Sequence, residues 1–355
     1  MKVLYISGTY YPATGGAEKS AYTLMEKINE KESFEAAVLT DKRYSGNEYG
    51  TKMFFTDHEE REESIEDAMN EFEPDVVFAQ LMWSDVAVKK SRENGLPSVL
   101  RVCKVPFERD ISKNSVYGPT KIVSNSAATK EFVKENFGRN STIIQPPVDI
   151  QELKDNFKGV SGDYITLFNP IVRKGGNVFK KLAEEMPEKS FSVVKGWDSL
   201  KEDGSGEFSE KYLSRISESI KDYGGETPKE VDMRDLENVD YLEPRMNVSE
   251  IYEKTCLLLV PSQWEETFGR VALEAMSLGI PVIASKVGGL KDVVGIEDLL
   301  VEEFDDPEKW REKVNRVLDE ENYDYFKERC LEKADEYSLE KIVGKYESIF
   351  KQVCK

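Results

Sequence analysis

Two glutamates in the second half of the chain could bind a ligand rich in hydroxyl groups. Glu266 and Glu274 stand eight positions apart, and Gly269 lies between them where a helix would begin. Each carboxylate oxygen accepts charge-assisted hydrogen bonds, which suits the paired hydroxyls of a sugar. The backbone N–H groups at such a helix start would point toward the same ligand. This stretch is the strongest candidate binding site in the sequence.

A second candidate site combines cations with glycines. Arg173 and Lys174 follow a strand-like run and precede Gly175–Gly176. A cation and the N–H groups of a helix start would converge there on an anion such as a phosphate. Gly15–Gly16, which follows the first strand-like run, would let the backbone approach a ligand at the carboxyl edge of a sheet.

Alternating strands and helices must position these residues. Short β-branched or apolar runs alternate with longer segments of helical period in both halves of the chain. This pattern predicts an α/β fold with two doubly wound, Rossmann-like domains that face a central cleft. The expected strands are Val3–Ser7, Ala36–Thr40, Asp75–Ala79, Ser98–Cys103, Lys121–Asn125, Tyr164–Phe168, Phe191–Lys195, Val239–Leu242, Leu257–Val260 and Pro281–Ser285.

The length and the turn residues favour two domains. The chain has 355 residues, more than a typical single domain, and prolines with polar residues mark a boundary near residue 150. We expect an N-terminal acceptor-side domain over 1–150 and a C-terminal donor domain over 151–337 that carries a polar insertion at about 198–237. Residues 338–355 form an amphipathic helix that could cap the second domain or cross back to the first.

Composition excludes several classes of protein. The net charge of −19 argues against a protein that mainly coats nucleic acid or an anionic membrane. No apolar run approaches the length of a membrane span and no signal-peptide core is visible, so we expect a cytoplasmic location. The four cysteines lie far apart, only one histidine is present, and no Asp-x-Asp motif occurs, so we expect no metal site.

Four segments together resemble the family 4 retaining glycosyltransferases, which have the GT-B fold. The stretch from Glu266 to Glu274 resembles the E-x7-E motif of that family, and Asn169–Gly176 resembles a strand-end loop whose lysine neutralises the phosphates of a nucleotide sugar. Tyr11–Glu18 resembles the first loop of the family, and Pro146–Asp149 resembles the end of its first domain. The similarity covers nearly the whole chain.

The resemblance implies a metal-independent, retaining hexosyltransferase that needs no cofactor. It would move a sugar from a nucleotide diphosphate donor of UDP or GDP type to a hydroxyl acceptor, which could be a glycan, a lipid-linked molecule or a small molecule. Glu266 would bind the donor sugar, Lys174 and Arg173 the diphosphate, and Glu274 the ribose. The other donor-binding residues that it implies are Gly15, Gly16, Asn169, Thr267, Phe268, Gly269 and Arg270.

The chain also departs from the pattern of the family. Cys103 and Gln80 stand where many relatives carry histidines, and Asn169 stands roughly where they carry an arginine, whose charge Arg173 could replace. The only histidine, His58, lies in a charged run that we expect to be solvated. The missing sugar contact would then come from other groups.

One basic segment runs against the overall acidity. Residues 89–121 hold eight basic and three acidic residues. A scatter of solvated lysines would explain this, but Arg101, Lys104 and Arg109, with Cys103 beside them, could instead face an anionic acceptor such as a lipid phosphate. The protein would then contact the inner face of a membrane peripherally.

Two other functions stay open from the sequence. One is a nucleotide-sugar-binding protein without transferase activity, and the other is an epimerase or phosphorylase on the same fold. An oxidoreductase is disfavoured because the first loop lacks the G-x-G-x-x-G motif.

Overall fold

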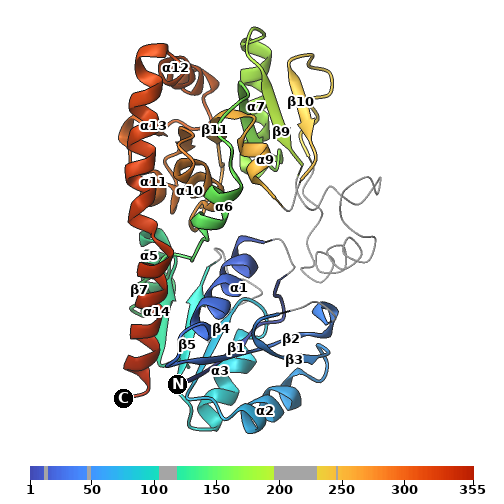
Figure 1. The fold of residues 1–355 in the computed structure, drawn as a ribbon, viewed down its shortest axis with the longest axis vertical. Coiled ribbons are helices and arrows are strands. Elements are labelled where there is room, and N and C mark those ends of the chain that lie inside the picture. The colour runs from blue at the N-terminus through green and yellow to red at the C-terminus, as the bar shows by residue number, and fades with distance from the viewer. Residues whose placement is uncertain (12–14, 46–48, 104–117, 196–229, 245–246) are drawn as a thin grey trace. The chain divides into compact units, whose positions relative to one another are not determined.

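The chain divides into two compact units. The computed structural model describes residues 1–11, 15–45, 49–103, 118–195, 230–244 and 247–355. Unit 1 comprises Met1–Val148 together with Leu339–Lys355, and unit 2 comprises Asp149–Ser338 (Figure 1). The division after residue 148 lies two positions before the boundary expected from the sequence, and the C-terminal helix belongs to unit 1.

Unit 1 is built on a parallel sheet. Its described strands form one seven-stranded sheet in the order β3-β2-β1-β4-β5-β6-β7. The strands are β1 (Lys2–Ile6), β2 (Glu35–Asp41), β3 (Lys52–Thr56), β4 (Val76–Gln80), β5 (Ser98–Val102), β6 (Lys121–Ser124) and β7 (Thr142–Ile143). The helices of this unit are α1 (Gly16–Asn29), α2 (Arg61–Phe72), α3 (Ser84–Glu93), α5 (Ala127–Phe137) and α14 (Leu339–Val353).

Helices cover the sheet of unit 1, so its central strands are buried on both faces. Every residue of β4 and β5 is buried, whichever face its side chain points to. The C-terminal helix α14 supplies part of this cover. The ring of Phe78 in β4 lies 5.7 Å from that of Tyr346 and 5.6 Å from that of Phe350, both at steep angles. Residues far apart in the sequence thus complete one core.

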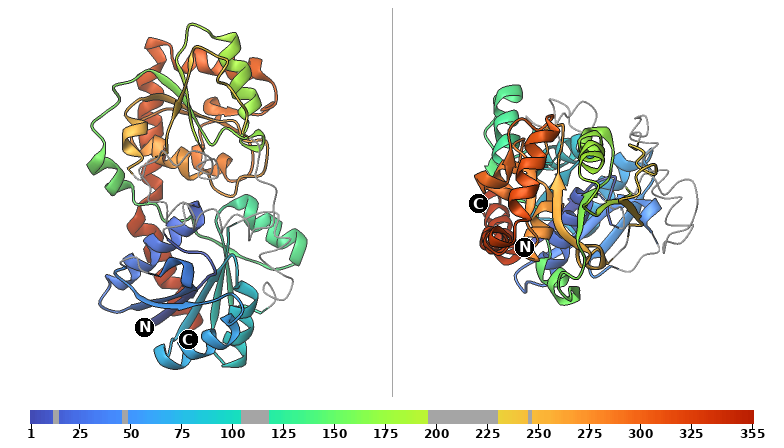
Figure 2. Two further views of the ribbon diagram at one scale, coloured as in Figure 1. Left: turned by 90° about the vertical axis from the view of Figure 1, so that its right-hand side faces the viewer. Right: turned by 90° about the horizontal axis from the view of Figure 1, so that it is seen from above.

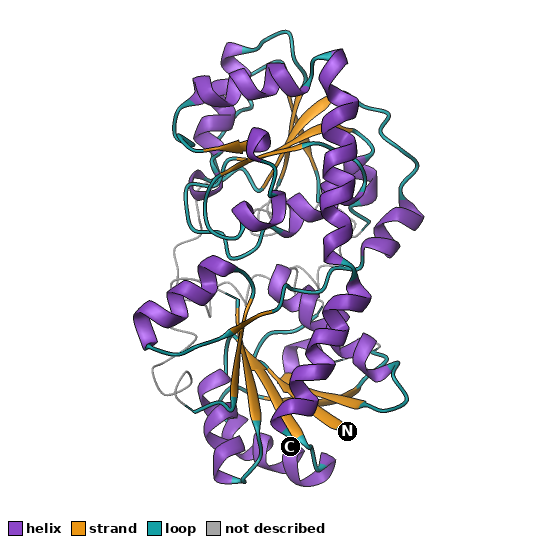
Figure 3. Ribbon diagram, turned by 90° about the vertical axis from the view of Figure 1, so that its left-hand side faces the viewer, coloured by secondary structure: helices purple, strands orange, loops and turns teal. Residues whose placement is uncertain are grey.

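Unit 2 repeats the same plan. Its described strands form a six-stranded parallel sheet in the order β10-β9-β8-β11-β12-β13. They are β8 (Tyr164–Phe168), β9 (Phe191–Val194), β10 (Val239–Leu242), β11 (Thr255–Val260), β12 (Val282–Ser285) and β13 (Leu300–Val301). The helices are α6 (Ile150–Asn156), α7 (Gly176–Glu185), α9 (Ser249–Tyr252), α10 (Arg270–Ser277), α11 (Leu290–Val294), α12 (Pro307–Val317) and α13 (Glu320–Ala334). Figures 2 and 3 show helices packed around the strands of each unit.

Both sheets contain a point at which the strand order reverses. In unit 1 it lies between β1 and β4, and in unit 2 between β8 and β11. Ligands of such sheets bind outside the carboxyl ends of the strands at this point. The loops after β1, β8 and β11 carry Gly15–Gly16, Lys174 and Glu266, so the sequence candidates lie where the topology predicts a site.

Within the described ranges, no helix combines the length and the hydrophobicity needed to cross a bilayer.

The packing of α14 makes a testable prediction. Phe350 is fully buried, so Phe350→Ala should destabilise unit 1 by about 3–5 kcal/mol. Hydrogen exchange measured by peptide should accelerate in β1 and β4 and stay unchanged in β11. Tyr325→Ala is the control because Tyr325 is 50% exposed. Faster exchange in β11 rather than β4 would show that α14 stabilises the other unit.

Candidate functional site

Three loops meet at the carboxyl edge of the unit 2 sheet. They follow β8, β11 and β12, and backbone hydrogen bonds join them: Gln263 donates its N–H to the carbonyl of Arg173 at 2.8 Å, and Gly289 donates its N–H to that of Glu266 at 2.6 Å. These contacts fix the β11 loop between its two neighbours.

Glycines allow the loops to approach so closely. A Cβ on Gly175 would lie 2.0 Å from the carbonyl oxygen of Pro261, and a Cβ on Gly288 would lie 2.1 Å from that of Glu266. Both glycines also have positive φ, 83° and 48°, which disfavours any other residue. The loops therefore pack backbone against backbone.

Glu266 is the centre of this site. Its Oε1 receives an ion pair from the Lys174 ammonium, a hydrogen bond from Trp264 Nε1 at 3.0 Å and one from Ser262 Oγ at 2.9 Å. The Glu266 side chain is 10% exposed. Burial by itself would raise the pKa of Glu266, but Lys174, with Trp264 and Ser262, outweighs it and holds the pKa below its usual range. The carboxylate is thus kept ionised inside the site.

The two cations of the β8 loop stack on one aromatic ring. The guanidinium of Arg173 lies 5.0 Å and the ammonium of Lys174 lies 5.3 Å from the centre of the Trp264 ring. Arg173 is exposed and forms no ion pair within the described residues, whereas Lys174 is 26% exposed at its side chain. The guanidinium therefore keeps donors available for an anion.

Glu274 is buried on α10 and bound internally. Its Oε1 accepts a hydrogen bond from Arg270 Nε at 2.6 Å, and its Oε2 accepts one from the Tyr252 hydroxyl at 3.0 Å. Burial raises the pKa of Tyr252 well above its usual value, and the neighbouring Glu274 raises it further. The phenol therefore stays protonated and can donate. The structure brings together Glu274, Arg270 and Tyr252. Binding of a ribose by Glu274 remains a prediction.

The other residues expected to bind the donor lie in the same loops, and their donor binding remains a prediction. Asn169 has a φ of 58°, and its backbone N–H donates to the carbonyl of Val194. Phe268 is buried, so its ring supports the β11 loop. Gly269, with a φ of 104°, precedes α10 directly, and Thr267 is half-buried.

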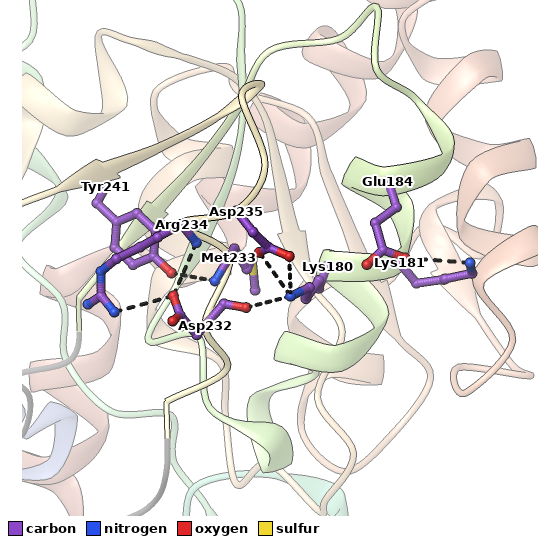
Figure 4. A network of polar contacts seen from close by, with 8 residues as sticks. All are labelled: Lys180, Lys181, Glu184, Asp232, Met233, Arg234, Asp235 and Tyr241. Carbon is purple, nitrogen blue, oxygen red and sulfur yellow. Dashed lines mark hydrogen bonds and ion pairs between the residues drawn. The ribbon is translucent and has the colours of Figure 1, made fainter.

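The end of the expected insertion packs beside the β8 loop. Residues 196–229 lie outside the described ranges, but Val231 donates its N–H to the Pro170 carbonyl at 2.8 Å. Lys180 on α7 holds this segment by donating to the Asp232 carbonyl at 2.8 Å and to Asp235 at 3.0 Å (Figure 4). Residues 231–235 therefore pack against the β8 loop, which carries Arg173 and Lys174.

In unit 1 the expected glycines stand at the start of α1. Gly15 precedes the helix and Gly16 begins it, and both are exposed. A Cβ on Gly15 would lie 2.1 Å from Glu18 Oε2, so a larger residue there would require the Glu18 side chain to move.

Residues with strained backbone angles follow strands in both units, at the carboxyl edges of the two sheets. Among the described residues, four other than glycine have positive φ, and three of them follow β4 or β8: Leu81 (52°), Trp83 (71°) and Asn169 (58°). Such strain often accompanies functional sites.

The expectations for the basic segment need correction. Arg101 does not face an acceptor at the surface, because it lies within β5 and is fully buried. Its Nη2 donates to the Ala17 carbonyl oxygen at 3.0 Å. Cys103 is also buried, at the end of the same strand. Lys104 and Arg109 lie outside the described residues.

Gln80 and His58 each form a side-chain hydrogen bond. Gln80 is buried and donates from Nε2 to the Ala17 carbonyl at 3.1 Å. His58 is exposed, as expected, yet its Nδ1 accepts a hydrogen bond from Trp83 Nε1 at 2.9 Å. Across the described ranges, no group of three or more His, Cys, Asp or Glu residues is placed to hold a metal ion.

Several contributors were not found from the sequence. Ser262 and Trp264 precede Glu266 by four and two positions, so the loop itself held the signal for them. Tyr252 lies 22 positions before Glu274, and nothing in the sequence links the two.

Part of unit 2 is similar to a known protein family. Residues 226–336 match the family described as "Glycosyl transferases group 1". The matched segment contains the whole β11 loop and α10, but it leaves out the β8 loop and unit 1.

Curated relatives match the chain over short stretches. The chain is 34% identical over 120 residues to N-acetyl-alpha-D-glucosaminyl L-malate synthase of Bacillus anthracis, covering 33% of this chain and 31% of that protein. It is 39% identical over 79 residues to D-inositol 3-phosphate glycosyltransferase 1 of Catenulispora acidiphila, covering 22% of this chain and 18% of that protein. The matches thus span a third or less of these relatives.

Solved structures match over nearly the full length. Sucrose-phosphate synthase from Thermosynechococcus elongatus superposes with a TM-score of 0.74 at 15% identity, covering 99% of this chain and 98% of that one. Anabaena HepE, solved with UDP and glucose, superposes with a TM-score of 0.72 at 16% identity, covering 99% and 100%. The expected GT-B fold with two Rossmann-like domains is confirmed.

The depressed pKa of Glu266 predicts a pH-dependent effect of Glu266→Gln. A carboxylate with a lowered pKa in the folded state stabilises the fold above its usual pKa, and this stabilisation is lost as the pH falls through the folded-state value. Glu266→Gln should therefore lower the melting temperature at pH 7, and the difference from wild type should shrink as the pH falls below about 4.5.

Thermal unfolding over a series of pH values checks this prediction. Glu265→Gln is the control, because it removes the same charge from an exposed neighbour and should change the melting temperature little. A difference for Glu266→Gln that stays constant down to pH 3 would show that the carboxylate is not stabilised by its partners.

Proposed function

We propose that the protein is a glycosyltransferase that moves a sugar from a nucleotide diphosphate sugar to a hydroxyl acceptor. The observation that carries this proposal is the arrangement of Arg173 and Lys174 on Trp264, directly beside the buried carboxylate of Glu266. The site thus presents cations and an ionised acceptor of hydrogen bonds next to one another. A nucleotide diphosphate sugar carries anionic phosphates, which would pair with the two cations. Next to them are sugar hydroxyls, which would donate hydrogen bonds to Glu266.

The cations suit the diphosphate. Arg173 offers planar guanidinium donors that pair well with phosphate oxygens, and Lys174 has further N–H donors besides the one that faces Glu266. The N–H groups at the start of α10, after Gly269, add partial positive charge at the same sheet edge.

Glu266 suits the sugar. Trp264, Ser262 and Lys174 converge on its Oε1, and Oε2 takes none of these three bonds. Oε2 is therefore the oxygen that would accept hydrogen bonds from sugar hydroxyls. The ring of Trp264 offers an apolar face beside it.

These placements support a retaining transfer. The bond between the anomeric carbon and the diphosphate oxygen breaks, the acceptor oxygen bonds to the same face of that carbon, and the acceptor proton passes to the leaving phosphate. Because the acceptor attacks the face from which the phosphate leaves, the anomeric configuration would be retained. Lys174 and Arg173 would stabilise the charge that develops on the leaving phosphate, in place of a metal or another cofactor. Domain closure that excludes water would suppress hydrolysis.

The donor is proposed to be of UDP or GDP type. Support for UDP comes from the structural neighbour HepE, which was solved with UDP-glucose. The acceptors named in the curated relatives are not carried over, because those matches leave out most of the chain. A cytoplasmic location is part of the proposal. Peripheral membrane contact stays a prediction, because Arg101 is buried and Lys104 and Arg109 lie outside the described residues.

A binding measurement tests the role of the cations. Lys174→Met should weaken the binding of UDP or GDP, whichever the wild type binds more tightly, by roughly 10- to 100-fold, because a charge-assisted contact with phosphate is lost. Titration calorimetry measures this. Lys181→Met is the matched control, since it removes a half-exposed lysine from the neighbouring helix. Equal affinities for wild type and Lys174→Met would refute the assignment.

A donor panel tests the activity itself. Wild-type protein incubated with UDP- and GDP-sugars should release the nucleoside diphosphate slowly from the correct donor, and faster once an acceptor is present. Binding of a donor with no release from any member of the panel, whether or not acceptors are added, would favour a binding protein. An isomerised sugar, or release that depends on added phosphate, would instead indicate an epimerase or a phosphorylase.

A further inference from the structure

Trp264 contacts both kinds of charged group that the proposed donor site uses. Its indole N–H donates to Glu266 Oε1 at 3.0 Å. The guanidinium of Arg173 and the ammonium of Lys174 lie 5.0 and 5.3 Å from the centre of its ring. One side chain therefore holds the two cations with its ring and the carboxylate with its N–H group.

The hydrogen bond to Glu266 orients the indole ring. The carboxylate oxygen that receives it also accepts from Ser262 and Lys174, so the indole is one of three donors to that atom. Glu266 is buried, and its carbonyl accepts a backbone hydrogen bond from the neighbouring β12 loop, whereas Trp264 is only half-buried. Because an indole has a single N–H donor, a bond to this fixed carboxylate sets the plane of the ring.

The oriented ring in turn orders two flexible side chains. Arg173 is exposed and forms no ion pair within the described residues, and Lys174 is paired with Glu266. Long cationic side chains lose rotamer freedom when a ligand fixes them, and this loss weakens binding. Cation–π contact with Trp264 restricts both side chains before a ligand arrives. Cations ordered in this way bind an anion more tightly.

We propose that Trp264 is a positioning residue that sets the spacing between the diphosphate and the sugar of the donor. This rests on the proposed function, in which Arg173 and Lys174 bind the diphosphate and Glu266 binds the sugar. The ring of Trp264 acts through the cations, and its N–H group acts through the carboxylate. Loss of the ring and loss of the N–H group should therefore affect different parts of the donor.

Two substitutions separate these contacts. Trp264→Phe keeps an aromatic ring and removes the N–H group, whereas Trp264→Leu removes both. Tyr325→Leu is the matched control, because it removes a 50% exposed aromatic ring from α13 of the same unit. Titration calorimetry on the intact chain measures the affinities for UDP, GDP and a panel of UDP- and GDP-sugars. The ratio of the affinities for a nucleotide sugar and for the nucleoside diphosphate of the same base reports what the sugar contributes.

Trp264→Phe should bind the nucleoside diphosphate within about twofold of wild type, because a ring still supports the cations. It should lose about tenfold of the preference for the nucleotide sugar, because a hydrogen bond that orients the carboxylate is gone. Trp264→Leu should bind the nucleoside diphosphate itself about tenfold more weakly. Tyr325→Leu should behave as wild type. A merely structural role of Trp264 would lower the melting temperature of both variants and leave the affinity ratio unchanged.

Wild-type affinity for the nucleoside diphosphate in Trp264→Leu contradicts the proposal, as does an unchanged ratio in Trp264→Phe. If Trp264→Leu does not fold, Trp264→Met replaces it, and wild-type affinity there is equally contradictory. If wild type binds none of the probes, the proposed function fails. The melting temperatures of Trp264→Phe, Glu266→Gln and the double variant then decide the positioning contact. A combined loss smaller than the sum of the two supports it, and additive losses overturn it.

Discussion

The proposed donor site depends on the ion pair between Lys174 and Glu266. A buried carboxylate is costly unless a counter-charge and hydrogen bonds replace water. Lys174 supplies the charge, and Ser262 and Trp264 supply the bonds. Because Lys174 follows β8 and Glu266 follows β11, this pair joins the two loops across the point at which the strand order reverses. Glycines that let these loops touch through their backbones make the pair possible.

Each unit buries a charged side chain near the carboxyl edge of its sheet. Unit 2 compensates Glu266 with Lys174, whereas in unit 1 the titratable group that interacts most strongly with Arg101 is the phenol of Tyr346. The compensated pair can remain stable before a substrate arrives, and its spare donors then meet the substrate.

Much of the fold was predictable, because parallel strands buried on both faces leave long apolar runs in the sequence. The strands that were missed have physical reasons. β3 is an edge strand whose first residue is the charged Lys52, and β7 and β13 have only two residues each. The site residues on each loop were predictable from glycines and charges. Their pairing was not, since Lys174 and Glu266 are 92 positions apart and only the strand order brings them together. Arg101 was misjudged because a basic residue suggests exposure, while its position in a covered strand buries it.

A crystal structure of the protein with UDP or GDP bound would test the central claim most directly. The account predicts diphosphate oxygens within hydrogen-bond distance of Arg173 and Lys174, with Glu266 still paired to Lys174 and Trp264. A nucleotide bound away from the β8 and β11 loops, or a diphosphate that contacts neither cation, would contradict it.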